Sequence, residues 1–363
     1  MSQSSFGNKF KVTTWGESHG KALGAVVDGC PAGLSLCEED IQVFLDRRKP
    51  GQSKYTTARK EGDLVEILSG VFEGKTTGTP ISLMVRNTDQ RSRDYGNIAY
   101  SYRPGHADYT FDQKYGFRDY RGGGRSSGRE TIGRVAAGAI ASKILSELGI
   151  SICTYTKSIG PVEITTFNKE EINNNAFYMP DALAAAKAGE YLEECMKNQD
   201  SAGGVIECRI SGTPAGLGDP VFDKLNAVLA HALMSIGAVK AVEVGDGIAV
   251  TSLKGSTDND GFTVKDGEIV KTSNHAGGIM GGISDGSEII VRVHIKPTPS
   301  ISQPQQTVTR EKEPLSMEIH GRHDPVIVPR AVVVVESMVA ITLADALFAN
   351  MSSQMDKVRD FYL

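Results

Sequence analysis

The sequence predicts an α+β fold in which helices pack against two sheets within one body, as a single domain over residues 1–363. Apolar residues at helical spacing place three helices, and runs rich in β-branched residues place three strands. The tetrapeptide Pro-Ala-Gly-Leu also follows a strand-like run twice, at 31–34 and at 214–217, each time before an acidic helix start. This echo favours an internal duplication, while a shared turn of this length can also arise by chance.

Two of the predicted helices begin with a capping box, a serine followed three residues later by a glutamate. The first is expected over residues 35–48 and the second over residues 127–148, with Gly149 as its stop. Because the glutamate reaches back to the first backbone amides, each box predicts where its helix begins. The boxes are Ser35 with Glu38, and Ser127 with Glu130.

The third predicted helix opens with Asp219 and Pro220, a capping residue followed by a residue that suits the first turn. Its inward side chains would be Phe222, Leu225, Leu229 and Leu233. A further apolar stretch over residues 331–351 contains Glu336 and Asp345, which favours a buried helix over a membrane span.

Strands are predicted at 23–28, 204–211 and 289–295, each close to a turn-forming glycine or proline. Two long polar segments, at 49–63 and 87–124, are rich in arginine, tyrosine and glycine. Loops of this length are usually functional. We therefore expect both to lie over a binding site and to close when a ligand binds.

Composition narrows the class of protein. The net charge of −5 argues against a nucleic-acid scaffold or a membrane-surface binder, so that no nucleic-acid or membrane partner is expected. The amino-terminal residues 1–12 are polar and have no apolar core, so we expect neither a signal peptide nor a membrane anchor. The five cysteines form no CxxC pair, which disfavours disulfides and zinc and favours a reducing, cytoplasmic location.

The segment 120–130, Tyr-Arg-Gly-Gly-Gly-Arg-Ser-Ser-Gly-Arg-Glu, is the strongest local signal. Free backbone N–H groups before a helix start make an anion site, with Arg125 and Arg129 as bidentate phosphate partners. The alternatives are a capped surface helix with solvated arginines and, less well supported, an RNA-binding Arg-Gly-Gly segment.

Two histidines lie in glycine-flanked turns, His19 within 16–20 and His106 within 103–109. An imidazole among cations is a candidate acid catalyst. Taken singly, each is more often a hydrogen-bonded loop histidine. Together with the anion loop, they indicate acid catalysis beside a phosphate.

Three further segments supply polar groups, at 274–279, 296–301 and 320–325. The last packs two histidines, an arginine and Asp324 into one turn, but Gly321 and Pro325 disfavour the spacing of metal ligands, and no metal is expected. A base or a second anion site is favoured there. Two anion cradles suggest two anions, a cofactor and a substrate.

These residues indicate an enzyme that removes phosphate from a small polyanionic substrate. A kinase or nucleotide phosphatase lacks support, because neither a GxxxxGK[ST] motif nor a carboxylate pair for magnesium is evident.

Seven segments in this order resemble the chorismate synthase family over nearly the whole chain. They are residues 16–20, 47–51, 103–109, 122–130, 274–278, 296–301 and 321–325. The resemblance implies a homotetramer of β-α-β sandwich subunits. It also implies elimination of phosphate from 5-enolpyruvylshikimate 3-phosphate to give chorismate, with reduced flavin mononucleotide (FMN) required although no net redox change occurs. The alternative is another phosphate-eliminating or flavin-binding enzyme, or a non-catalytic flavin carrier.

The resemblance also implies roles for individual residues. His19 would face the leaving phosphate and His106 the flavin, as proton donors, and Asp324 would act as the base relayed through the flavin. The substrate would lie against Arg48, Lys54, Arg103 and Arg129. The flavin would contact Arg125, Ser126, Ser127, Gly237, Ala238, Gly278, Lys296, Pro297, Thr298, Pro299, Ser300 and Arg322.

Two positions depart from the family pattern. Lys54 stands where relatives commonly carry arginine, which keeps the charge and loses the bidentate fork. Gly128 stands where alanine is common. NADPH would serve as the flavin reductant, and the residues leave open whether this chain or another protein reduces the flavin.

Overall fold

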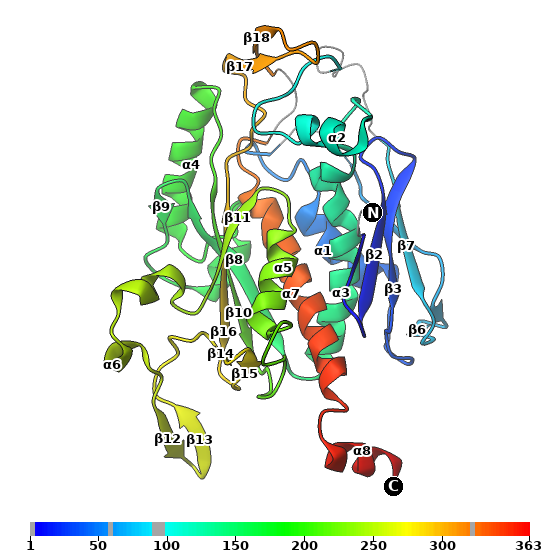
Figure 1. Cartoon of the computed structure of the whole chain (residues 1–363), viewed down its shortest axis with the longest axis vertical. Helices are drawn as coiled ribbons and strands as arrows, with labels where there is room; N and C mark the ends of the chain where they lie inside the picture. The colour runs from blue at the N-terminus through cyan, green and yellow to red at the C-terminus, as the bar shows by residue number, and fades with distance from the viewer. Residues whose placement is uncertain (1–3, 57–60, 89–98, 320–323) are drawn as a thin grey trace.

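The computed structural model describes residues 4–56, 61–88, 99–319 and 324–363. These residues form two five-stranded antiparallel sheets with long helices between them (Figure 1). The amino-terminal sheet has the order β1 (Ser5–Phe6), β2 (Lys11–Gly16), β3 (Ala22–Asp28), β7 (Ile81–Arg86) and β4 (Val65–Ile67). The second sheet has the order β11 (Val239–Val244), β16 (Ile289–Ile295), β10 (Gly204–Ser211), β8 (Ser151–Ile159) and β9 (Val162–Glu163).

Two helices form the middle layer. Helix α3 (Thr131–Glu147) packs on β3, α7 (Val328–Asn350) packs on β8 and β10, and the two helices pack on each other. Their approach is close because a Cβ on Gly138 would lie 2.2 Å from Ser337 Cβ. Helix α7 is long and apolar enough to cross a membrane by composition, but 72% of its most apolar window is buried inside the protein. It is a core helix.

Helices α1 (Glu38–Arg48) and α5 (Leu225–Met234) extend this layer beside α3 and α7. Outside it lie α2 (Asp108–Tyr115), α4 (Ala182–Lys197), α6 (Gly255–Asp258) and α8 (Met355–Tyr362). The short hairpins are β5 (Val71–Phe72) with β6 (Lys75–Thr76), β12 (Phe262–Lys265) with β13 (Glu268–Lys271), β14 (Ile279–Met280) with β15 (Ile283–Ser284), and β17 (Gln305–Val308) with β18 (Pro314–Met317).

The two halves of the chain repeat one plan. In each, a strand, the Pro-Ala-Gly-Leu turn, a helix, an edge strand and a further strand precede a central helix. One hairpin, β5–β6, comes before the further strand in the first half, and two, β12–β13 and β14–β15, come before it in the second. The turns also share their contacts. Thr76 Oγ1 donates to Pro31 O at 2.6 Å, and Ser284 Oγ donates to Pro214 O at 2.6 Å. The echo in the sequence therefore corresponds to matching local structure.

The predicted strands agree with β3, β10 and β16 to within a residue, but several helix predictions are wrong. Helix α1 begins at Glu38 with Cys37 as its cap, because the Asp40 carboxylate accepts from the Cys37 backbone, and not at Ser35. Helix α5 begins at Leu225 instead of Asp219, and Phe222 is 91% exposed.

Two other predictions need correction. Ser127 does cap a helical turn, accepting from Arg129 N, but that turn is the 3-10 helix η3 (Gly128–Glu130) that precedes α3. The Glu130 carboxylate accepts from Thr14 and Arg134 and closes no capping box. The predicted loop 87–124 contains helix α2.

Candidate active site

A cavity of about 1060 Å³ opens beside the end of β2. The glycine-rich loop before α3 lines it, together with His19 and the aromatic side chain of Trp15. The loop passes through a short 3-10 turn, η2 (Gly124–Ser126), so that its backbone lies against the cavity. A space of this size is large enough for a cofactor or a substrate.

Arg125 and its neighbours hold the loop in place. The Arg125 guanidinium donates to Gly16 O at 3.1 Å and to Thr14 Oγ1 at 2.6 Å, which ties the loop to β2. Ser126 Oγ donates to Gly123 O at 2.7 Å. The Arg125 side chain is 29% exposed, so part of it can still meet a ligand in the cavity.

His19 lies in the turn that follows β2, and its Nδ1 lies 3.0 Å from Ser18 Oγ. The glycine-rich loop packs directly against its ring. A Cβ on Gly122 would lie 2.2 Å from His19 Nδ1, a distance that real Cβ atoms do not adopt. The loop and the histidine therefore fit together only because residue 122 is glycine.

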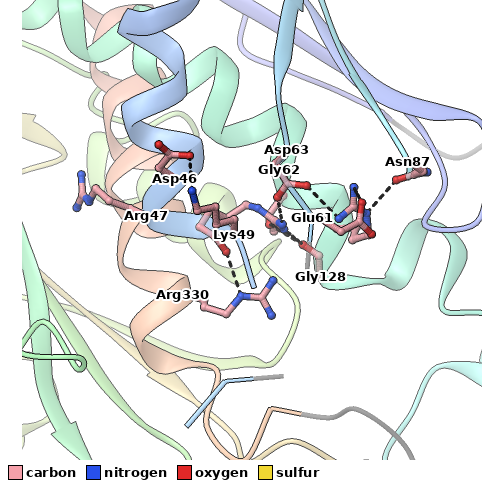
Figure 2. A network of polar contacts seen from close by, with 12 residues as sticks. Asp46, Arg47, Lys49, Glu61, Gly62, Asp63, Asn87, Gly128 and Arg330 are labelled. Carbon is pink, nitrogen blue, oxygen red and sulfur yellow. Dashed lines mark hydrogen bonds and ion pairs between the residues drawn. The ribbon is translucent and has the colours of Figure 1, made fainter. Parts of the chain in front are cut away.

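Arg48 and Arg129 are buried and paired with carboxylates of the same segment, Glu61–Asp63 (Figure 2). Arg48 Nη2 lies 2.7 Å from Asp63 Oδ2, and Arg129 Nη1 lies 3.1 Å from Asp63 Oδ1. Arg129 Nη2 lies 3.2 Å from Glu61 Oε2. One Asp63 carboxylate thus holds two guanidiniums side by side.

The charged groups in this cluster shift one another's pKa values. The pKa of Arg48 is lowered to about 10, chiefly because the side chain is buried. The neighbouring Asp63 acts in the opposite direction and raises this pKa, whereas Arg330 and Arg129 also lower it. Burial would raise the pKa of Asp63, but Arg48 and Arg129 outweigh it and keep that pKa below its ordinary value. Asp63 is therefore ionised at neutral pH.

The cluster continues to Asp324. Arg330 Nε donates to Arg48 O at 3.0 Å, and Arg330 Nη1 donates to Asp324 Oδ2 at 2.5 Å. At the other end, Arg129 Nε donates to the Asn87 side-chain oxygen at 3.0 Å (Figure 2). We call this series, from Asn87 through Arg129, Asp63, Arg48 and Arg330 to Asp324, the polar chain.

Arg103 and His106 form a second cluster around Asp108. Arg103 donates to both Asp108 oxygens at 2.7 Å, and His106 Nδ1 lies 2.9 Å from Asp108 Oδ1. Burial would raise the pKa of Asp108, but Arg103 and the adjacent His106 lower it well below its ordinary range. Asp108 therefore remains a carboxylate and fixes the orientation of the His106 ring.

The segment 296–300 packs against the His106 turn. Lys296 Nζ donates to Gly105 O at 2.7 Å, and its backbone N–H donates to Ala238 O at 3.0 Å. A Cβ on Gly105 would lie 3.0 Å from Pro299 Cβ. The structure thus brings the Ala238 turn, this segment and His106 together.

Gly278 lies in a separate loop that is held by Asn274, whose Oδ1 accepts from Gly278 N at 2.9 Å. Lys271, whose side chain is buried, pairs with Asp260 at 3.0 Å and with Asp285 at 2.8 Å. Asp260 in turn accepts from the backbone N–H groups of His275 and Ala276, so this ion cluster holds the loop in place.

One predicted residue lies elsewhere. Lys54 pairs with Glu193 of α4 at 2.6 Å, and both side chains are exposed. Arg322 lies outside the described residues. Within the described ranges, no group of three or more His, Cys, Asp or Glu side chains could hold a metal ion.

Sequence reasoning missed Glu61, Asp63 and Asn87. Asp63 and Asn87 are members of the polar chain, and Glu61 pairs with Arg129 beside it. Two acids separated by one glycine carry no recognised motif, and their partners lie far away in the sequence. Only the long loop in which Glu61 and Asp63 fall could have drawn attention to them.

Comparisons with known proteins agree over the whole chain. The family model described as chorismate synthase matches residues 10–348. The chorismate synthase of Agathobacter rectalis is 66% identical over 100% of this chain and 99% of its own length, and that of Chloroflexus aurantiacus is 55% identical over 96% of each. A solved structure entitled "Crystal Structure of Chorismate Synthase" superposes with a TM-score of 0.78 at 34% identity, covering 98% of this chain and 97% of that one.

Proposed function

The chain belongs to the chorismate synthase family, phosphate-eliminating lyases of the shikimate pathway that use reduced FMN, and we propose that the residues around the polar chain carry out this elimination. The observation that carries the proposal is the polar chain itself. It joins a cationic pair, Arg48 and Arg129, to the carboxylate of Asp324 at one end. At the other end Asn87 accepts from Arg129 and donates to the two carbonyls that flank Ser18 and His19. An elimination needs these parts: cations for the anions, an acid and a base.

The reaction breaks the ring C–O bond to phosphate and removes a ring hydrogen, so that a double bond forms and no net oxidation occurs. His19 donates a proton toward the departing phosphate oxygen, which lowers the cost of the leaving charge. Arg129, Arg48 and Arg103 hold the substrate anions, and His106 is the proton donor on the flavin side. Asp324 is the final acceptor of the ring hydrogen as a proton.

Reduced FMN, when bound, supplies electron density to the ring as phosphate departs, because a ring C–H is too weakly acidic for a carboxylate alone. The residues fit such a cofactor. Buried Thr298 Oγ1 has no hydrogen-bond partner among the described residues, and the glycine-rich loop bounds a cavity of sufficient size. Lys296, Thr298 and Ser300 would bind its polar groups, and Arg125 its phosphate.

We extend the proposal to the whole protein. The repeated plan supports an ancient duplication within one domain over residues 1–363. The β-α-β sandwich, with the central helices between the sheets, is the subunit, and four copies assemble as a homotetramer in the cytoplasm. NADPH serves as the flavin reductant.

The absorbance spectrum of the purified protein tests the assignment. We expect added FMN to show a perturbed spectrum only when 5-enolpyruvylshikimate 3-phosphate is also present, because substrate and cofactor share one water-excluded site. Equal perturbation without the substrate would favour a flavin carrier. A response to a nucleoside triphosphate in place of the substrate would favour a kinase.

A further inference from the structure

Asn87 follows β7 and bridges two parts of the site through one side chain. Its Nδ2 donates to Gly20 O at 2.8 Å and to Glu17 O at 3.1 Å, the two carbonyls that flank Ser18 and His19. Its Oδ1 accepts from Arg129 Nε at 3.0 Å. The amide therefore holds the turn of the acid with its nitrogen. Its oxygen holds the anion-binding guanidinium, a contact that Figure 2 shows.

Only a primary amide satisfies this arrangement. The nitrogen must donate twice, toward two carbonyl oxygens, while the oxygen must accept from a cation. An ionised carboxylate at this position has no N–H or O–H to donate, so it would face the two carbonyl oxygens without a hydrogen bond. The backbone N–H of Asn87 donates separately to Lys21 O at 3.1 Å, so a substitution of the side chain keeps that anchor.

Arg129 cannot easily adopt another orientation. Asp63 engages Nη1, Glu61 engages Nη2 and Asn87 engages Nε. A guanidinium carries more N–H donors than these three partners use, so donors on its terminal nitrogens remain for an anion. Asn87 is the contact that links this fixed cation to the His19 turn.

We propose that Asn87 is a positioning residue for the elimination, which holds the His19 turn and the Arg129 guanidinium in one arrangement. The acid and the cation then meet the same phosphate-bearing substrate with a fixed separation. Displacement of an acid by about 1 Å can cost on the order of a hundredfold in rate. This inference rests on the proposed function, because it takes His19 as the acid.

The two arms of the amide can be separated by substitution. Asn87→Asp keeps the acceptor for Arg129 and loses both donors to the turn. We expect kcat to fall by roughly tenfold to a hundredfold, with the substrate Kd within about threefold of wild type. Asn87→Ala loses both arms, and we expect the substrate Kd to rise by about tenfold as well, because a hydrogen bond to a charged group is lost. FMN affinity should not change in either variant.

A double-mutant cycle distinguishes positioning from a structural role. In a His19→Ala background, Asn87→Asp should cause no further loss of kcat, because its effect passes through His19. The matched control is Asn175→Ala. That amide also donates to two backbone carbonyls, Glu171 O at 2.9 Å and Met179 O at 2.8 Å. Its loss should lower the melting temperature and leave kcat and KM unchanged.

The outcomes that would overturn the inference differ from the one that would overturn the proposed function. Equal losses of kcat in both backgrounds, or a wild-type kcat for Asn87→Asp, would overturn the inference while the proposed function stands. Should Asn87→Asp fail to fold, the substrate Kd of Asn87→Ala decides in its place, and an unchanged value overturns the link to Arg129. If the wild-type chain itself forms no chorismate, the proposed function fails.

Discussion

Gly122→Ala should displace the His19 ring from its position in the site without disturbing the fold. The backbone of Gly122 has no positive φ, so alanine brings no conformational strain of its own. Its Cβ, however, would lie 2.2 Å from His19 Nδ1, 2.4 Å from His19 Cε1 and 3.0 Å from Ser18 Oγ. The ring must therefore withdraw by about 1 Å, a displacement that costs on the order of a hundredfold in rate when the ring is the acid.

Steady-state kinetics under anaerobic conditions, with photoreduced FMN and saturating substrate, measure the effect. We expect kcat to fall by about a hundredfold, while overpacking lowers the free energy of unfolding by about 1–3 kcal/mol. Gly128→Ala is the matched control in the same loop, because a Cβ there would meet no atom within 4 Å. It should behave like wild type.

The result that refutes this reasoning is a Gly122→Ala variant with the wild-type kcat. It would mean either that the ring position does not matter or that His19 is not the acid. A loss of kcat in Gly128→Ala of the same size would instead assign the effect to the loop backbone.

The remaining predictions concern the histidines, the arginines and stability. His19→Ala and His106→Ala should each lower kcat by about a hundredfold or more with both ligands still bound, as measured by titration calorimetry; a wild-type rate in either removes its role. Arg129→Ala should weaken substrate binding more than FMN binding and Arg125→Ala should do the reverse, and equal losses in both titrations would mean that the two anion sites are not separate. Burial would raise the pKa of Asp260, but the hydrogen bonds from Ser273, the backbone of the 274–278 loop and Lys271 lower it well below its ordinary range. The stability that Asp260 contributes is therefore present above about pH 4 and is lost as the pH falls toward the lower pKa of the folded state. Asp260→Asn should lower stability at pH 7 by about 1–3 kcal/mol and flatten its decline between about pH 4 and pH 2 in urea unfolding; an unchanged acid profile would show that Asp260 is not coupled to folding.

Local patterns predicted part of the fold well. The strands β10 and β16 match their predicted bounds, because runs of β-branched residues between turns leave little ambiguity. The predicted start of α5 is wrong. Asp219 and Pro220 are typical of a helix start, but here they lie in the irregular segment that precedes the helix. Tertiary packing at Leu225, which is buried, decides the helix start instead.

Local sequence signals predicted some residues of the site and missed others. The glycine-rich loop and His19 could be predicted because each carries its signal within a few residues. Asp63 and Asn87 could not, because their importance arises only when the fold brings them to Arg129, 66 and 42 residues away in sequence. The burial of Arg48 also could not be predicted, since it depends on Asp63 and on the carbonyl of Gly128.

Flavin stoichiometry tests the central claim most directly. In anaerobic buffer, photoreduced FMN at a small fraction of the substrate concentration should support complete release of phosphate, with the flavin still reduced at the end, because the elimination leaves the oxidation level unchanged. Turnover with oxidised FMN, or oxidation of one reduced flavin for every phosphate released, would contradict the account.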